Sequence, residues 1–238
     1  MLARDCTVWV AAVPPRTDHL VSLIDDVERT RRARLRNVAD RDRFTSAAAL
    51  VRLLAGQAAG RPPDTVRIDR TCPECGQPHG RPRLVDEPGL DISVSHAGRF
   101  VAVATSARGQ VGVDVEVVPG EWRDLAAVAC TPSERVLVED ARGFAITWVR
   151  KEAVLKAFGH GLRVAPAEVQ VSAPNSAPEL LRYRGAVAPA CTLVDVDIVA
   201  DDQAHVAAVA VLGHPTATID VRDGSAHLVS PTAVPRRS

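Results

Sequence analysis

The sequence predicts an α/β protein built from two similar halves. Segments with helical periodicity alternate with short strand-like segments along most of the 238 residues. Two segments also recur at almost the same separation: residues 49–54 can be aligned with 153–158, and 101–104 with 207–210, at offsets of 104 and 106 residues. We therefore expect an internal duplication in which each half has one helix and one hairpin. The cleft between such halves is the natural place for a ligand.

The composition fits a globular protein with an aliphatic core. Hydrophobic residues make up 46% of the chain but aromatic residues only 3%, so the core must come from Val, Leu, Ile and Ala. The formal net charge is zero, which disfavours a nucleic-acid binder. The sequence has no apolar run of about 18 residues, so we expect no membrane span.

Cysteine and lysine usage give two further indications. The five cysteines are an odd number in a chain of this size, which argues against a disulfide framework and favours the cytoplasm. Lysine occurs only at Lys151 and Lys156, whereas the other 27 basic residues are arginine. Because an ammonium is a compact point charge and a guanidinium is a planar fork, this segment could have a specific use for ammonium groups. Chance clustering explains two residues equally well.

The elements of the first half follow from local patterns. Residues 7–13 form an apolar strand-like run without a cationic leader, so they predict a first strand and not a secretory signal. Helical patterns cover 25–36 and 40–59, and Gly60 and Pro62 end the second of these helices. The stretch 71–88 is rich in Pro, Gly and Cys and predicts a loop. Strands are expected at 91–95 and 100–105, joined by a turn at 97–99.

The second half repeats this alternation. A strand at 110–118 is followed by one or two helices within 122–141, by a long helix at 143–158, and by strands at 191–198 and 205–212. From these elements we expect an N-terminal α/β half at 1–108, a C-terminal α/β half at 109–213, and a loosely held tail at 214–238.

Two carboxylates share one face of the strand at 110–118. Side chains alternate along a strand, so Asp114 and Glu116 point the same way while Val113 and Val115 point into the core. Two neighbouring carboxylates repel each other unless a positive group lies between them, and Mg²⁺ prefers oxygen ligands. Spacing alone, however, favours a simpler interpretation, an amphipathic edge strand with a solvated acidic face.

The helix at 143–158 carries a second set of polar residues. Trp148, Glu152 and Lys156 are spaced i, i+4, i+8 and share one face. Taken alone, this spacing favours an ordinary Glu–Lys surface pair. The tryptophan on the same stripe and the scarcity of lysine point instead to the wall of a site. Glu152 would then be a third metal ligand, and Lys156 would neutralise phosphate oxygens.

Three other motifs carry possible chemistry. In Ser93-Val94-Ser95-His96 the hydroxyls, the imidazole and the following turn amides suit a phosphate, whereas a catalytic pair of adjacent Ser95 and His96 is geometrically poor. Cys72, Cys75 and His79 lack the second cysteine pair of a usual zinc site, so a plain loop with buried thiols is favoured. Seven arginines between positions 29 and 43 fit either a solvated helix face or an anion site.

Together these residues resemble the Sfp-type 4'-phosphopantetheinyl transferases. The motifs occur in the order and approximate spacing of that family, and they span residues 31–162, more than half of the chain. Arg81 stands where some relatives carry lysine, and Phe44 is bulkier than the small polar residue expected beside Arg43. The motifs that carry the resemblance are Gly80-Arg81-Pro82, Ser93-Val94-Ser95-His96, Gly112-Val113-Asp114-Val115-Glu116, and Trp148 to Ala157 followed by Gly159 and Gly161-Leu162.

The resemblance implies a fold, a reaction and a set of site residues. Two α/β halves would form a pseudo-dimer within a cytoplasmic monomer, with coenzyme A (CoA) as co-substrate in the cleft. Mg²⁺, or Mn²⁺, would be held by Asp114, Glu116 and Glu152. CoA would be contacted by Arg31, Arg43, Arg81, Ser95, His96 and Lys156. Catalysis would rest on Asp114, Glu152 and Lys156, with Glu152 or a water that it orients as the base.

The implied reaction moves the phosphopantetheine arm of CoA onto a serine of an apo acyl or peptidyl carrier protein, as in fatty-acid, polyketide or non-ribosomal peptide synthesis and other secondary metabolism. Two alternatives stay open at this point. One is a catalytically silent module that binds CoA or a carrier, although such a module would not need Asp114, Glu116, Glu152 and Lys156 together. The other is a different Mg²⁺-dependent phosphate-ester enzyme, which would release free phosphopantetheine.

Overall fold

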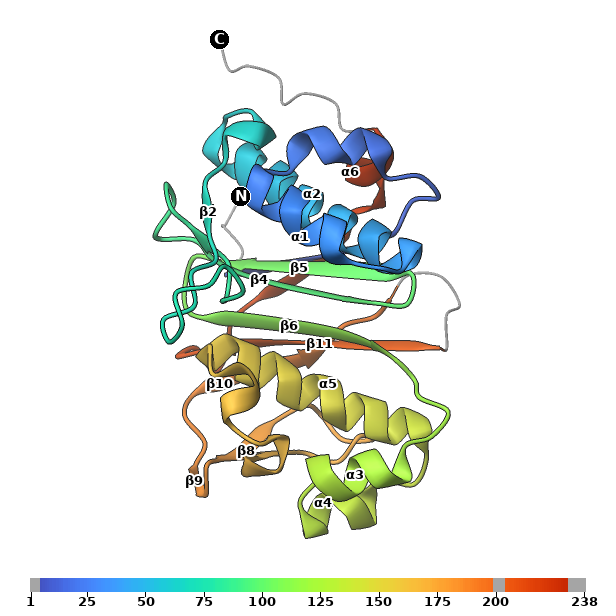
Figure 1. Ribbon diagram of the computed structural model, residues 1–238. Helices are drawn as coiled ribbons and strands as arrows, with labels where there is room; N and C mark the ends of the chain where they lie inside the picture. The colour runs from blue at the N-terminus through green and yellow to red at the C-terminus, as the bar shows by residue number, and fades with distance from the viewer. Residues whose placement is uncertain (1–4, 199–203, 231–238) are drawn as a thin grey trace.

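The computed structural model describes residues 5–198 and 204–230 and shows four layers, helix–sheet–sheet–helix (Figure 1). Two sheets face each other in the middle of the molecule, and helices cover the outer side of each sheet. The core between the sheets is aliphatic, with Val8 and Val10 on one side and Val113 and Val209 on the other. A mixed α/β fold, as expected from the sequence, is therefore confirmed.

The first sheet has the strand order β12-β1-β5-β4. Its strands are β1 (Cys6–Ala12), β4 (Asp91–Ala97), β5 (Phe100–Ser106) and β12 (Ile219–Asp223). The pairs β1–β5 and β4–β5 are antiparallel, and β12 runs parallel to β1. Val101 and Val103 of β5 point to the covering helix, whereas Ala102 and Ala104 point to the second sheet, as strand alternation requires.

The helices of the first half lie over this sheet. After a 3₁₀ turn at Asp18–Leu23, α1 (Asp26–Arg34) begins with a capping box formed by Asp25 and Glu28. The long helix α2 (Val38–Ala59) follows and ends at Gly60, whose φ is +66°. The fully buried Arg52 of α2 donates to Glu28 at 2.8 Å and so ties α1 to α2.

The second half repeats the arrangement around a sheet with the order β10-β11-β6. Helix α5 packs against this sheet, and Leu155 of α5 and Ala208 of the central strand are fully buried in the same core. None of the helices among the described residues is long and apolar enough to cross a membrane. The further elements are β6 (Val111–Val117), α3 (Arg123–Ala129), α4 (Pro132–Leu137), α5 (Ala141–Phe158), β7 (Val169–Val171), β8 (Leu180–Tyr183), β9 (Ala186–Val187), β10 (Cys191–Asp195) and β11 (His205–Leu212), with the short pair β2 (Ile68–Asp69) and β3 (Arg83–Leu84) in the first half.

The segments that match within the sequence occupy equivalent places in the two halves. Residues 49–54 lie in α2 and 153–158 lie in α5, the long helix on the outside of each sheet. Residues 101–104 and 207–210 lie in β5 and β11, and each of these strands has neighbours on both sides. The division at residue 108, which falls between β5 and β6, stays a prediction.

The expectation of a loosely held tail at 214–238 is wrong for residues 219–229. Strand β12 extends the first sheet beside β1, and α6 (Ser225–Val229) places the fully buried Leu228 in the core of the first half. His19 hydrogen-bonds to the carbonyl oxygen of Leu228 at 2.8 Å. The composition of this segment hid these contacts, because only Gly224 and Leu228 among its residues are buried. Residues 231–238 lie outside the described part of the chain.

Gly112 sets the distance between β6 and α5. A Cβ atom at this position would lie 1.9 Å from the carbonyl oxygen of Ala153 and 2.4 Å from the amide nitrogen of Ala157, both in the backbone of α5. No side chain can rotate away to relieve such contacts. The strand and the helix can therefore approach this closely only if residue 112 has no side chain.

We expect Gly112→Ala to lower the free energy of unfolding by about 1–3 kcal/mol, because the added methyl group must push α5 away from β6. Gly120→Ala is the matched control, since a Cβ there meets nothing within 4 Å; its effect should stay within about 0.5 kcal/mol. Urea unfolding of both variants measures the difference. Equal stability of the two variants would contradict the close packing.

Candidate active site

Side chains of β4 join the two halves along the edge of β6. Strands β4 and β6 belong to different sheets, yet the backbone amide of Val111 donates to the Asp91 carboxylate at 2.7 Å, and that of Val113 donates to the Ser93 hydroxyl at 3.0 Å. Asp91, Ser93 and Ser95 are alternate residues and therefore share one face of β4. Polar side chains thus take the place of a backbone ladder at this seam.

Lys156, Asp114 and Ser95 form a closed triangle at the end of the seam. The Lys156 ammonium donates to Asp114 Oδ1 at 2.6 Å and to Ser95 Oγ at 2.9 Å, and the Ser95 hydroxyl donates to the same Asp114 oxygen at 2.7 Å. Asp114 is only 2% exposed, so its strand does not present a solvated acidic face. Lys156 pairs with Asp114 across the site and not with Glu152 on its own helix.

Two glutamates adjoin this triangle. Burial, together with the negative charge of Asp114, raises the pKa of Glu116 to about 7, although the Trp148 side chain hydrogen-bonds to that carboxylate. Burial and the Asp114 charge also raise the pKa of Glu152, and the Lys156 charge acts in the opposite direction. Three carboxylates are therefore crowded together, and the single ammonium of Lys156 offsets only part of their negative charge.

The three carboxylates fit a hard divalent cation in their chemistry. Asp114 Oδ2 and Glu152 Oε1 are buried and accept no hydrogen bond within the described structure. Buried acceptors without partners are costly, and a cation would satisfy them. The donor oxygens of Asp114, Glu116 and Glu152 do not all lie within 4.8 Å of one another. Among the described residues, the one group of three possible metal ligands that meets this distance is Cys72, Cys75 and His79.

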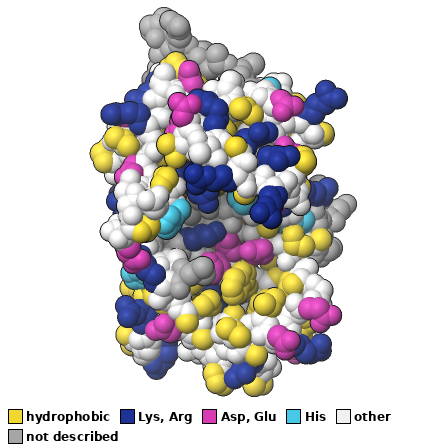
Figure 2. All heavy atoms as spheres, in the orientation of Figure 1, with side chains coloured by type: hydrophobic (Ala, Val, Ile, Leu, Met, Phe, Trp, Pro, Cys, Tyr) yellow, Lys and Arg dark blue, Asp and Glu magenta, His cyan; other side chains and the backbone are white. Residues whose placement is uncertain are grey.

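Positive charges of the first half face this acidic cluster. The pKa of His96 is lowered because the ring is partly desolvated and because Lys156, Arg43 and Arg31 place positive charge around it. Arg43 also donates to the carbonyl oxygen of Gly98 at 2.8 Å, at the turn after β4. On the face shown in Figure 2, Lys and Arg side chains gather across the middle of the molecule next to acidic ones.

Arg31 and Phe44 explain one departure from the expected sequence pattern. The Arg31 guanidinium carbon lies 5.5 Å from the centre of the Phe44 ring, and Phe44 is 8% exposed. The buried Phe44 ring thus makes a cation–π contact with the Arg31 guanidinium. The bulky residue beside Arg43 therefore packs inside the half and does not fill the cationic region.

Arg81 connects the two halves. Its guanidinium donates to the carbonyl oxygens of Ala157 at 2.8 Å and Val111 at 2.6 Å, and it pairs with the Asp91 carboxylate. Both carbonyl groups belong to the second half, whereas Arg81 follows the loop after β2. Sequence reasoning missed the role of Asp91, which binds both Arg81 and the Val111 amide. Its place two residues before Ser93 on a polar strand face was the available signal.

The two lysines have different roles. Lys151 is fully buried and donates to Glu134 at 2.6 Å, to the carbonyl oxygen of Ala129 at 2.9 Å and to that of Pro166 at 3.1 Å. It therefore links α5 to α3, to α4 and to the segment after α5, and none of these hydrogen bonds involves the carboxylate cluster. Of the two lysines, only Lys156 reaches the site, so their proximity in sequence does not reflect one shared function.

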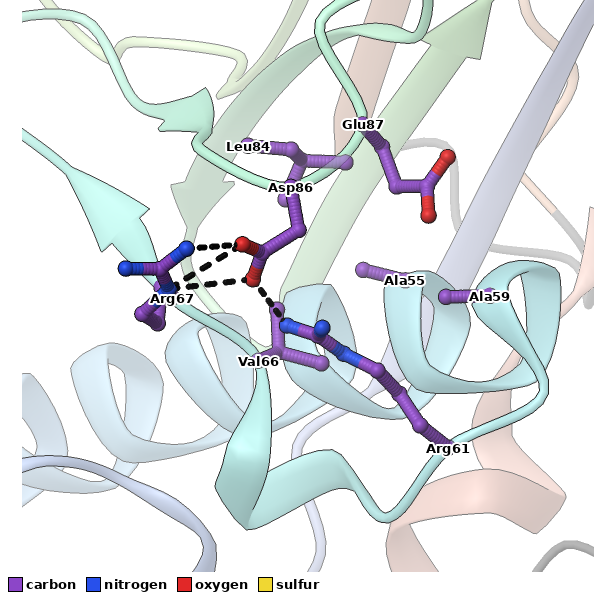
Figure 3. Close-up of a pocket in the computed structure, with 8 residues that line it drawn as sticks. All are labelled: Ala55, Ala59, Arg61, Val66, Arg67, Leu84, Asp86 and Glu87. Atoms are coloured by element: carbon purple, nitrogen blue, oxygen red, sulfur yellow. Dashed lines mark hydrogen bonds and ion pairs between the residues drawn. The ribbon is translucent and has the colours of Figure 1, made fainter.

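A small cleft elsewhere does not compete with this site. It lies beside α2 and has a cavity volume of about 10 Å³. Its lining residues are Ala55, Ala59, Arg61, Val66, Arg67, Leu84, Asp86 and Glu87 (Figure 3). Such a volume is that of a single water molecule. Arg67 and Arg61 bind the Asp86 carboxylate and hold its pKa far below the usual value, so these charges stabilise the loop around them.

Comparisons with known proteins point to one family. The model of the 4'-phosphopantetheinyl transferase superfamily matches residues 110–210, which include β6, α5 and their carboxylates. The chain is 30% identical over 184 residues to the 4'-phosphopantetheinyl transferase HetI of Nostoc, covering 73% of this chain and 72% of HetI. It is 26% identical over 151 residues to a putative 4'-phosphopantetheinyl transferase of Synechocystis, covering 59% of each protein.

A similarity to a 4'-phosphopantetheinyl transferase of Bacillus subtilis amounts to 23% identity over 151 residues, 61% of this chain and 64% of that protein. The matched family region contains the strand and the helix that supply Asp114, Glu116, Glu152 and Lys156. The enzyme class expected from the sequence is thereby confirmed. The chain belongs to the 4'-phosphopantetheinyl transferase superfamily.

Proposed function

We propose that this enzyme transfers the phosphopantetheine arm of CoA to a serine hydroxyl of an apo acyl or peptidyl carrier protein and releases adenosine 3',5'-bisphosphate, with Mg²⁺ or Mn²⁺ as its metal. The observation that carries the proposal is that three crowded carboxylates lie next to a group of cationic side chains, which we call the cationic wall: Arg31, Arg43, His96 and Lys156. The charge of Asp114 raises the pKa values of Glu116 and Glu152, and the charge of Lys156 acts on both glutamates and on His96.

The cationic wall supports binding of the CoA phosphates. Arg31, Arg43 and His96 come from the first half, and Lys156 comes from the second, so an anion between the halves would meet both groups. Arginine suits phosphate because its planar fork donates two parallel hydrogen bonds. Ser95 adds a hydroxyl at the same place. Arg81 would act near the adenosine 3'-phosphate while it keeps the halves together.

Asp114, Glu116 and Glu152 would hold the divalent cation. The fit rests on the two buried oxygens of Asp114 and Glu152 without partners and on the raised pKa values of Glu116 and Glu152. When bound, the cation supplies neutralisation of the negative charge on the pyrophosphate oxygens. The carboxylates themselves lose their mutual repulsion in that state, which offsets part of the cost of burying them.

Lys156 is proposed to stabilise the leaving group. Its ammonium already has one carboxylate partner, Asp114, at 2.6 Å, and its side chain is 28% exposed. A phosphate oxygen entering from the exposed side would give the same ammonium a second negative partner. Charge that develops on the leaving bisphosphate would be stabilised by this fixed donor without reorganisation of the site.

Glu152 is the proposed base for the carrier serine. Burial raises its pKa, which strengthens it as a proton acceptor, and its Oε1 has no partner among the described residues. The serine oxygen would attack the β-phosphorus of CoA, a bond to phosphorus would form while the bond to the bisphosphate breaks, and the serine proton would pass to Glu152 or to a water that it orients.

The cytoplasmic location, the monomeric state and a role in secondary metabolism stay predictions from the sequence.

Intact-protein mass spectrometry tests the reaction. An apo carrier domain incubated with the enzyme, CoA and Mg²⁺ should gain the mass of one phosphopantetheinyl group, and EDTA should abolish the gain because the carboxylates would be left unneutralised. Release of free phosphopantetheine without a modified carrier would favour a hydrolase. Binding of CoA with no product on several carrier types would favour the silent module.

We expect Lys156→Met to lower kcat/KM for CoA by about 10²–10³-fold, because the preorganised cation at the leaving group is lost. Lys156→Arg is the matched control: it keeps the charge but not the compact shape, and should recover part of the activity. Steady-state kinetics, normalised to the folded fraction from circular dichroism, measure both. A less than tenfold loss in the methionine variant would exclude this role.

We expect Glu152→Gln to lower kcat by about 10²–10⁴-fold, since glutamine keeps the shape of the side chain but cannot take a proton. Single-turnover transfer to the carrier and calorimetric titration of Mg²⁺–CoA separate chemistry from binding. Full turnover with normal Mg²⁺–CoA affinity would sink the assignment of Glu152 as base. If the variant lost affinity for Mg²⁺–CoA but kept its rate of transfer, Glu152 would be a metal ligand and not the base.

A further inference from the structure

Cys72, Cys75 and His79 converge on one point of the loop between β2 and β3. One ligand atom from each residue can be chosen so that all three atoms lie within 4.8 Å of one another. The Cys75 sulfur is 2.9 Å from His79 Nε2. Both cysteines are free thiols, Cys75 and His79 are exposed, and Cys72 is half-buried. The segment is a loop, as expected, but the expectation that its thiols are buried is wrong.

The backbone of the loop builds this convergence. The amide of Gly76 donates to the carbonyl oxygen of Cys72 at 2.9 Å, and the amide of Cys72 donates to the carbonyl oxygen of Gln77 at 2.9 Å. Gly76 has a φ of +69°, which favours glycine and reverses the chain directly after Cys75. The nearby backbone amides of Cys75 and Glu74 lower the pKa of the Cys72 thiol. The turn thus brings two sulfur atoms to one side and returns the chain toward His79.

Little else holds this loop in its shape. Apart from the half-buried Cys72, the side chains from position 71 to 79 are exposed, so the loop has no apolar core. Its neck is closed by the two-residue pairing of β2 with β3 and by the Gly80 amide, which donates to the Arg70 carbonyl oxygen at 2.7 Å. Ordering such a segment costs conformational entropy that no burial offsets. A cross-link through a metal ion would supply the missing stabilisation.

We propose that Cys72, Cys75 and His79 bind one Zn²⁺ ion, with water in the fourth position. Two sulfurs and one imidazole nitrogen are borderline-soft donors that suit Zn²⁺, whereas Mg²⁺ requires oxygen. Both thiols would bind as thiolates, and their two protons would pass to solvent. A second cysteine pair is not needed, because the turn at Gly76 brings His79 to within hydrogen-bond distance of Cys75.

The ion would stiffen a segment that reaches the second half. Glu74, between the two cysteines, pairs with Arg163 at 2.7 Å, and Arg163 also donates to the carbonyl oxygen of Gly159 at 2.6 Å. Arg81, two residues after His79, donates to Ala157 and Val111. The zinc would thus be structural: it fixes the loop from which Arg81 braces the two halves. It is separate from the carboxylate site, and its test does not depend on transferase activity.

Elemental analysis of the purified chain tests the proposal. The protein is purified under reducing conditions, supplied with zinc, passed through a desalting column and analysed by inductively coupled plasma mass spectrometry. We expect about one zinc per chain. Cys75→Ser and His79→Ala should each lose most of the metal, because neither leaves three strong ligands. Cys191→Ser is the matched control and should keep it, since it alters a cysteine outside the loop.

Two further measurements keep the proposal falsifiable if a variant does not fold. Cobalt in place of zinc should give the wild-type chain a sulfur-to-metal charge-transfer band, and zinc should protect two of the five thiols from alkylation. A chain that retains no zinc, or zinc that persists in Cys75→Ser and His79→Ala, would overturn the proposal. So would a Cys72–Cys75 disulfide in the protein purified under reducing conditions.

Discussion

Lys156 donates to the buried carboxylate of Asp114 at 2.6 Å, and most of the site depends on this ion pair. The lysine comes from α5, the aspartate from β6, and the serine that binds both comes from β4 of the other half. The triangle of these three residues therefore closes only when both halves and the helix above them are in register. Removing either charged partner would leave the other charge uncompensated. Gly112 permits this contact, since it lets α5 lie directly against β6.

The two halves contribute opposite charges. Carboxylates on β6 and α5 repel one another, and burial raises the pKa values of Glu116 and Glu152. Arginines of the first half surround His96 and face them. A substrate with several phosphates and a divalent cation would neutralise both groups at once. The surrounding fold thus holds like charges close together, and strain of this kind is a usual cost of a preorganised site.

Buried charges outside the site serve a different purpose. Arg52 ties α2 to α1, Lys151 ties α5 to α4, and Arg150 donates to Asp195 at 2.8 Å in β10. Each of these cations has its acceptors on neighbouring elements, so it fixes packing and leaves no group for a ligand. Asp114 and Glu152 differ from these cations, because each has a buried oxygen that accepts no hydrogen bond within the described structure.

The sequence alone determined the mixed α/β class, most of the long elements, and the residues expected to carry the chemistry. Alternation along the strand at 110–118 and the i, i+4, i+8 spacing on the helix at 143–158 are local properties, so they could be inferred without the fold. Only the tertiary structure decided that Lys156 enters the site while Lys151 is buried elsewhere, and that Asp91 and Arg81 brace the halves. It also decided that residues 219–229 return to β1 and that Cys72, Cys75 and His79 meet. These outcomes depend on contacts between elements, or on the three-dimensional path of a loop, and hydrophobic periodicity does not encode either.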